Sequence, residues 1–145
     1  MPTQVIPQAA AIAVRDGLVC LVTSSRTRRW TLPKGTIEAG QTAEECVRQE
    51  SWEEAGLFGA LQPEPLGWYE GDKLGRPTAV AVFLLHVTEV SDDWPERAIR
   101  RRHWVTPKKA LTVLAVAGQR EVLRAAIDDG RLRTAFLPSQ TTARP

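Results

Sequence analysis

The sequence contains few of the residues that support a disulfide-bonded or membrane-bound protein. Its two cysteines, Cys20 and Cys46, lie in apolar segments and have no spacing typical of metal or redox sites. We therefore expect buried, reduced thiols and a reducing compartment. The longest apolar run, Ala79 to Leu85, is too short to cross a bilayer. The first residues, MPTQVIPQAAAIAV, lack a basic region, so we expect no signal peptide and no membrane association.

A strong net charge is also absent. The 19 basic and 17 acidic residues leave a net charge of +2, which is too small to indicate a nucleic-acid polymer as partner. With 43% hydrophobic and 25% charged residues, the composition is that of an ordinary globular protein. The length of 145 residues suits one domain. We predict a cytoplasmic monomer or homodimer with a single domain over residues 1–145 and a flexible tail after about residue 138.

Turn-forming residues divide the chain into strands and helices. Apolar runs on either side of Asp16-Gly17 predict a hairpin. The predicted strands cover residues 9–14, 18–23, 66–69, 78–90 and 102–105. The stretches SSRTRRWTLPKG and DDWP are predicted loops. Predicted helices begin at Thr42, Thr106 and about Gly118, and the first has a capping box with Glu45. This mixture predicts an α/β or α+β domain with a mixed sheet.

The first predicted helix turns acidic residues toward the body of the protein. At about 100° per residue, Glu50 and Glu54 project with the apolar residue Val47, and Glu53 lies at the edge of the same face. Desolvating several unpaired charges costs several kcal/mol each, so these carboxylates need a counter-charge. Either a divalent cation or basic residues elsewhere in the chain could supply it. Carboxylates at i, i+3 and i+4 offer hard oxygen ligands that suit Mg²⁺ or Mn²⁺.

Two clusters of basic residues lie near this helix in the sequence. Arg26, Arg28, Arg29 and Lys34 precede it, and a second basic run extends from residue 97 to residue 109. Cations beside a metal site are typical of enzymes that bind phosphate-rich substrates. The alternative for each cluster is an exposed surface that only improves solubility.

The segment GTIEAGQTAEECVRQESWEEAGL, residues 35–57, resembles the signature box of the Nudix hydrolases. The positions that match the family pattern without a shift of register are Gly35, Glu50, Glu53, Glu54, Gly56 and Leu57. The resemblance implies an α/β/α sandwich and metal-dependent hydrolysis of a diphosphate bond, with the three glutamates as metal ligands. The flanks, SSRTRRWTLPKG and VTEVSDDWPERAIRRRHW, look like the diphosphoinositol polyphosphate and diadenosine polyphosphate phosphohydrolase branch. The resemblance covers roughly residues 9–114.

Three positions depart from the family pattern. Gln41 and Gln49 stand where the family has a Glu and an Arg that form an ion pair. We predict that a Gln41–Gln49 hydrogen bond replaces this pair, because two amides can bond without leaving a charge alone. Ser51 stands where the family has an aliphatic residue, which costs packing but touches no ligand. These departures put the rate and the metal affinity in question more than the class of chemistry.

The resemblance assigns roles to individual residues. A metal held by Glu50, Glu53 and Glu54 would lower the pKa of a bound water, which attacks phosphorus in line. The proton would pass to Glu50 or to Glu96, for which the alternative is an exposed loop acid. The predicted substrate-binding residues are Ser24, Ser25, Arg26, Arg28, Lys34, Gly35 and Arg76.

We expect a small-molecule polyphosphate as substrate, either a dinucleoside polyphosphate or a diphosphoinositol polyphosphate. One alternative is the cleanup of nucleotides such as nucleoside triphosphates or ADP-ribose. Another is a ligand-binding regulator that kept the fold and lost catalysis.

Overall fold

The computed structural model of the chain describes residues 4–134. Its elements are β1 (Ile6–Arg15), β2 (Leu18–Thr23), β3 (Trp30–Thr31), β4 (Lys34–Thr36), α1 (Ala43–Ala55), β5 (Leu57–Leu61), β6 (Gly67–Lys73), β7 (Arg76–Val90), β8 (Arg102–Val105), α2 (Pro107–Val113), α3 (Ala117–Asp128) and α4 (Arg131–Thr134). The predicted flexible tail after about residue 138 lies outside the described residues.

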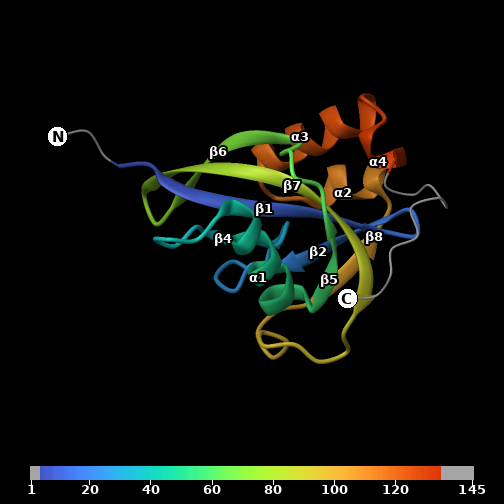
Figure 1. Cartoon of the computed structure of the whole chain (residues 1–145), viewed down its shortest axis with the longest axis horizontal. Coiled ribbons are helices and arrows are strands. Elements are labelled where there is room, and N and C mark those ends of the chain that lie inside the picture. The colour runs from blue at the N-terminus through green and yellow to red at the C-terminus, as the bar shows by residue number, and fades with distance from the viewer. Residues whose placement is uncertain (1–3, 135–145) are drawn as a thin grey trace.

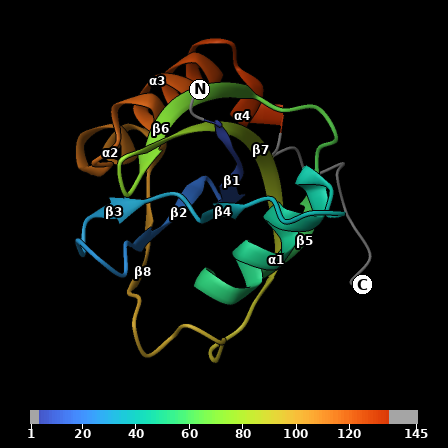
Figure 2. The same ribbon diagram turned by 90° about the vertical axis from the view of Figure 1, so that its left-hand side faces the viewer.

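The strands form one mixed sheet between two helical layers. The main strand order is β3-β2-β1-β7-β5, and β4, β6 and β8 pair with β1, β7 and β2. Strands β1 and β7 run parallel, and the other pairs are antiparallel. Figures 1 and 2 show α1 on one side of the sheet and α2 and α3 on the other. This arrangement confirms the predicted α/β/α sandwich with a mixed sheet.

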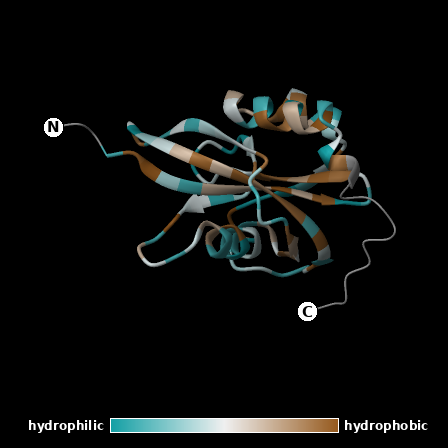
Figure 3. Cartoon of the chain, turned by 45° about the horizontal axis from the view of Figure 1, so that its top comes forward, coloured by the Kyte–Doolittle hydropathy of each residue, from teal (hydrophilic) through white to brown (hydrophobic). Residues whose placement is uncertain are grey.

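The central strand β1 is buried on both faces. Its side chains alternate, so that Ala10, Ile12 and Val14 join the core under α3, while Ala9, Ala11 and Ala13 join the core under α1. Figure 3 shows hydrophobic residues concentrated along the central strands, between the helical layers. The small alanines let α1 approach the sheet closely, and this brings its inward carboxylates next to β4.

Local sequence signals correctly predict the hairpin and the caps of α1, which we call the acidic helix because it contains five glutamates. Asp16 and Gly17, with φ of 53° and 79°, form the tight turn between β1 and β2. Thr42 Oγ1 accepts a hydrogen bond of 3.0 Å from the Glu45 backbone, and Glu45 Oε1 accepts one of 2.8 Å from the Thr42 backbone. Gly56 ends α1 in the left-handed conformation. Both cysteines are free and buried, as predicted.

Three short strands differ from the sequence prediction. Strand β3 and the first two residues of β4 lie within SSRTRRWTLPKG, which was predicted to be an irregular loop, and β5 follows α1 directly. Strands of two or three residues are too short to show a periodicity of their own, and β4 forms because it pairs with the distant β1. Strand β5 contains Gly59 at a bulge, where a Cβ would lie 2.1 Å from the His86 carbonyl oxygen. Across residues 4–134, no helix is long and apolar enough to pass through a membrane.

Candidate active site

Helix α1 turns two of its glutamates toward the sheet. Glu54 is 5% exposed and Glu50 is half-buried, whereas Glu44 and Glu45 on the opposite side are exposed. This confirms the orientation predicted from the helical wheel. Burial raises the pKa of both inward carboxyls, and the charge of Glu53 raises the pKa of Glu50 further. The ionised carboxylates are therefore destabilised where they stand.

Glu50 packs directly against the backbone of β4 at Gly35. A Cβ at position 35 would lie 2.3 Å from Glu50 Cδ and 2.6 Å from Glu50 Oε1, far inside van der Waals contact. Only glycine leaves room for the carboxylate here. The structure thus gives Gly35 a steric role in the close approach of α1 to β4, and its predicted role in substrate binding stays a prediction.

Two elements hold the carboxylate of Glu54. Its Oε1 accepts a hydrogen bond of 3.1 Å from the Lys34 backbone, and its Oε2 accepts one of 3.1 Å from Arg100 Nη2. Burial lowers the pKa of the Lys34 ammonium, and the nearby charge of Glu54 opposes this effect. The predicted basic residue Lys34 therefore lies beside the acidic residues.

The role of Arg100 was not predicted from the sequence, in which it is one residue of the second basic run. The side chain is 12% exposed and also binds Glu96 Oε1 through Nε at 2.6 Å and the Thr23 carbonyl through Nη1 at 2.9 Å. The sequence left two sources of counter-charge open for the acidic helix, a metal ion or a distant basic residue. The structure shows a distant basic residue, Arg100, at Glu54. The i,i+4 spacing of Glu96 and Arg100 was one local signal that could have found it.

Glu96 lies beside the acidic helix and is not an exposed loop acid. Its backbone N–H donates to the Glu53 carbonyl at 2.9 Å, and its carboxylate binds Arg100. Its charge is one of the causes that raise the pKa of Glu50 and Glu54. The structure therefore brings both candidate bases, Glu50 and Glu96, to the same place.

The predicted hydrogen bond between Gln41 and Gln49 is confirmed. Gln41 Nε2 donates to Gln49 Oε1 at 2.8 Å, and Gln49 Nε2 donates in turn to Glu53 Oε2 at 2.8 Å. At the other end, Gln41 Oε1 accepts from the Glu38 backbone at 3.0 Å. We call these contacts the amide relay. It connects the loop before α1 to the carboxylate of Glu53 and orients that side chain.

The three glutamates have the right chemistry for a divalent cation, but their side chains are not gathered around one point. Within the described part of the chain, no group of three or more His, Cys, Asp or Glu side chains lies close enough together to hold a metal ion. The amide relay engages Glu53, and Lys34 and Arg100 engage Glu54. Hard oxygen donors, an inward position and the raised pKa values of Glu50 and Glu54 all fit Mg²⁺ or Mn²⁺.

The loop between β2 and β3 carries four of the predicted substrate-binding residues. Ser25, Arg26 and Arg28 are exposed, and Arg28 has a φ of 61°. Ser24 Oγ shapes the turn by accepting the Arg26 backbone N–H at 3.3 Å. Thr23, just before the loop, accepts the Arg101 backbone N–H at 2.8 Å. The loop therefore borders the segment that contains Glu96 and Arg100.

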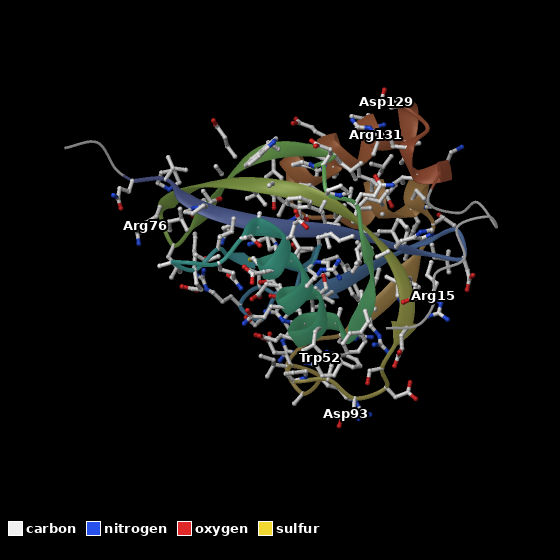
Figure 4. The ribbon with its side chains drawn as sticks, viewed as in Figure 1. Arg15, Trp52, Arg76, Asp93, Asp129 and Arg131 are labelled. Atoms are coloured by element: carbon white, nitrogen blue, oxygen red, sulfur yellow. The ribbon has the colours of Figure 1, made fainter. Side chains whose placement is uncertain are left out.

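Arg76 lies apart from that loop, at the turn between β6 and β7. Figure 4 shows it well separated from Asp93, which lies in the segment before β8. Arg76 lines a cavity of about 450 Å³ together with Thr36, Glu38 and Lys73, among other residues. Lys73 Nζ donates to Thr36 Oγ1 at 2.9 Å. Because Thr36 follows Gly35 in β4, the cavity adjoins the strand on which Glu50 rests.

The second basic run does not form a single exposed surface. Arg97 and Arg101 are exposed, but Arg102 is half-buried, stacks over Trp94 at 4.1 Å from the ring centroid and donates to the Ala55 carbonyl at 2.8 Å. Arg100 and Arg102 point inward with Arg101 between them, as the period of two in an extended chain requires. This alternation was visible in the sequence.

Fold and site together define a protein of the Nudix class. The acidic helix α1 packs on the mixed sheet, against the glycine of β4. The model of the NUDIX domain matches residues 5–126, and the chain belongs to this family.

Known relatives are about one third identical to the chain over the aligned residues. It is 36% identical to Nudix hydrolase 12, mitochondrial, from Arabidopsis thaliana, covering 80% of this chain and 63% of the relative. It is also 36% identical to diphosphoinositol polyphosphate phosphohydrolase 3-alpha from Mus musculus, covering 69% of this chain and 62% of the relative. The chain thus spans less than two thirds of the length of these relatives.

A solved structure supports the fold alone. The binary complex of a C. elegans Ap4A hydrolase matches with a TM-score of 0.71 and 19% identity, covering 90% of this chain and 99% of that one.

Proposed function

We propose that this chain is a divalent-metal-dependent hydrolase that cleaves a phosphoanhydride bond in a highly phosphorylated small molecule. The observation that carries this proposal is the inward pair Glu50 and Glu54 of α1. Glu50 packs against Gly35 of β4, and Glu54 accepts a hydrogen bond from the Lys34 backbone in the same strand. Carboxylates in such a position call for a cation. A lysine next to them suits the negative oxygens of a phosphate group. Membership of the Nudix family supports the same class of reaction.

We assign the following roles, which the positions of the side chains support. Glu50, Glu53 and Glu54 would hold Mg²⁺ or Mn²⁺, which supplies charge stabilisation and a more acidic water when bound. Glu50 or Glu96 would accept the proton of the attacking water, and Glu96 would have to release Arg100 to do so. Lys34 would neutralise non-bridging oxygens of the substrate.

The distribution of cations supports a substrate with several phosphate groups. Arg26 and Arg28 are exposed on one edge of the site, and Lys73 and Arg76 line the cavity on another. A substrate with several phosphate groups carries enough negative charge to engage cations on both edges. None of the described residues that line the cavity is aromatic, so the cavity offers no ring for base stacking. Between the two substrate classes, this favours a diphosphoinositol polyphosphate, the class named in a mouse relative.

The test is release of phosphate and nucleotide from a substrate panel, measured with Mg²⁺, with Mn²⁺ and with a chelator. The panel contains diadenosine polyphosphates, diphosphoinositol polyphosphates, nucleoside triphosphates and ADP-ribose. We expect metal-dependent cleavage of one polyphosphate class. Cleavage of only nucleoside triphosphates or ADP-ribose would replace the substrate class. Tight binding without turnover would indicate a regulator.

Variants test the assignment of the ligands. Glu53→Gln and Glu54→Gln should each reduce turnover by at least about 100-fold, the upper end of what losing an outer-shell partner costs. Glu44→Gln is the matched control, because Glu44 is an exposed glutamate of the same helix. Circular dichroism checks that each variant folds. Unchanged rates in both ligand variants would refute the metal assignment.

The location and the assembly of the chain stay predictions. We propose a cytoplasmic monomer or homodimer, although one relative is named as mitochondrial. Size-exclusion chromatography with light scattering would measure the assembly directly.

A further inference from the structure

Arg100 uses every part of its guanidinium group inside the protein. Nε binds Glu96, Nη1 binds the Thr23 carbonyl and Nη2 binds Glu54, with distances of 2.6, 2.9 and 3.1 Å. Over the described residues, it is the only basic side chain that forms an ion pair with any of Glu50, Glu53 and Glu54. Without a metal ion, the direct ion pair of Glu54 is therefore formed by Arg100, with the Lys34 ammonium as a second positive charge nearby.

A metal ion at Glu54 would compete with this guanidinium. Both oxygens of the Glu54 carboxylate are already engaged, Oε1 by the Lys34 backbone and Oε2 by Arg100. An added divalent charge beside this largely buried carboxylate repels the guanidinium strongly, because the local screening is weaker than in water. The Lys34 contact involves a neutral N–H and opposes the ion less. Arg100 is thus the partner that has to give way.

Arg100 also connects the acidic helix to the segment before β8. Its backbone N–H donates to the Glu96 carbonyl at 3.0 Å, and the Glu96 backbone N–H donates to the Glu53 carbonyl at 2.9 Å. The carboxylate of Glu96 binds the same guanidinium. A displacement of Arg100 therefore changes the surroundings of Glu96 and the packing of residues 94–100.

We propose that Arg100 is an internal counter-cation of Glu54 that a divalent metal ion displaces, so that metal binding is coupled to the position of residues 94–100. This proposal rests on the proposed function through one point, the assignment of Glu54 as a metal ligand. In this proposal, Arg100 and the metal ion compete for the carboxylate of Glu54. A residue that only positions Glu54 would have the opposite effect on metal affinity.

The first experiment measures Mn²⁺ affinity from the electron paramagnetic resonance signal of free Mn²⁺. Arg100→Gln should tighten Mn²⁺ binding by at least about threefold, because a competing charge in a weakly screened site is removed. Arg97→Gln is the matched control, since Arg97 lies in the same segment but is exposed and screened, and its effect should stay within about twofold. Arg100→Lys keeps the charge but loses the fork geometry, so its affinity should fall between those of wild type and Arg100→Gln.

The second experiment follows backbone amide hydrogen exchange by mass spectrometry. Added Mg²⁺ should increase exchange in residues 94–100 of the wild-type protein. In Arg100→Gln, exchange there should be high without metal and should change little when Mg²⁺ is added. If Arg100→Gln does not fold, Arg100→Lys and the wild-type exchange decide the question.

The outcomes separate this inference from the proposed function. Weaker or unchanged Mn²⁺ binding by Arg100→Gln, or wild-type exchange that does not respond to Mg²⁺, would overturn the role of Arg100 alone. If the wild-type protein bound no Mn²⁺ and cleaved nothing, the proposed function would fall, and this inference with it.

Discussion

Gly35 offers a direct test of how closely the acidic helix must approach β4. The Cβ of an alanine at this position would lie 2.3 Å from Glu50 Cδ, whereas ordinary van der Waals contact begins at 3.4 Å. The carboxylate of Glu50 must therefore retreat by about 1 Å in a Gly35→Ala variant. The variant moves one proposed metal ligand and leaves its chemistry unchanged.

The fold should tolerate this change better than the site does. The clashing atoms belong to the end of a flexible side chain that is half-buried, so the free energy of unfolding should fall by less than about 1 kcal/mol. A misplacement of about 1 Å at a reacting centre can reduce the rate by about 100-fold. We expect kcat to fall between about 10-fold and 100-fold, with a melting temperature close to that of the wild-type protein.

The assay compares metal-dependent hydrolysis in the wild-type protein and four variants, namely Gly35→Ala, Gly67→Ala, Glu50→Gln and the double variant Gly35→Ala with Glu50→Gln. Gly67→Ala is the matched control, because Gly67 is also a strand glycine, and its added Cβ would meet only Val122 Cγ1 at 3.3 Å, in the core under α3. If Gly35→Ala acts through Glu50, the double variant with Glu50→Gln should be no slower than Glu50→Gln alone. A wild-type rate for Gly35→Ala, or losses that multiply in the double variant, would refute the reasoning.

Three further predictions concern stability. Ser51→Ala should raise the free energy of unfolding in urea by about 1 kcal/mol, because Ser51 Oγ is buried without a hydrogen-bond partner in the described structure; a decrease would contradict this. Gln49→Arg alone should lower the melting temperature slightly, because it breaks the exposed amide relay. Adding Gln41→Glu should restore the melting temperature. Equal melting temperatures for the single and double variants would count against the relay. Burial raises the pKa of Glu54 above its ordinary value of 4.5, and Arg100 opposes this effect, so the contribution of Glu54 to stability is complete below pH 4.5 and is lost as the pH rises through the raised pKa. Thermal unfolding in chelator should show this loss, Glu54→Gln should reduce it, and saturating Mg²⁺ should oppose it.

The acidic helix could be predicted in detail because its signals are local. The capping box, the terminal glycine and the direction of each glutamate all depend on residues within about four turns of one another. The structure places Glu50 and Glu54 on the inner face, as the helical wheel predicts. The Gln41–Gln49 bond could be predicted as well, because both positions lie in a spaced motif and their amides are complementary.

Contacts between distant segments could not be predicted in this way. Arg100 binds Glu54 across 46 positions and the Thr23 carbonyl across 77. In the sequence, Arg100 is one of three successive arginines. The only local signals that distinguish it are the alternation of an extended chain and its i,i+4 spacing from Glu96. The short strand β4 was missed for the same reason, since its partner residues in β1 lie about 25 positions earlier.

The contacts of Arg100 and of the amide relay indicate how a metal ion and a basic residue can both act as counter-charges of the acidic helix. From the sequence, a metal ion and a basic residue were alternatives, because either could neutralise inward carboxylates. The contacts are compatible with a site that uses both: if Glu53 and Glu54 bind a cation as proposed, they remain inside the site when the cation leaves and then need another partner. Arg100 supplies that partner at Glu54, and the amide relay does so at Glu53. Under the proposed metal assignment, such a site stays folded without metal, at the cost that Glu53 and Glu54 must each exchange a hydrogen bond before they can bind the ion.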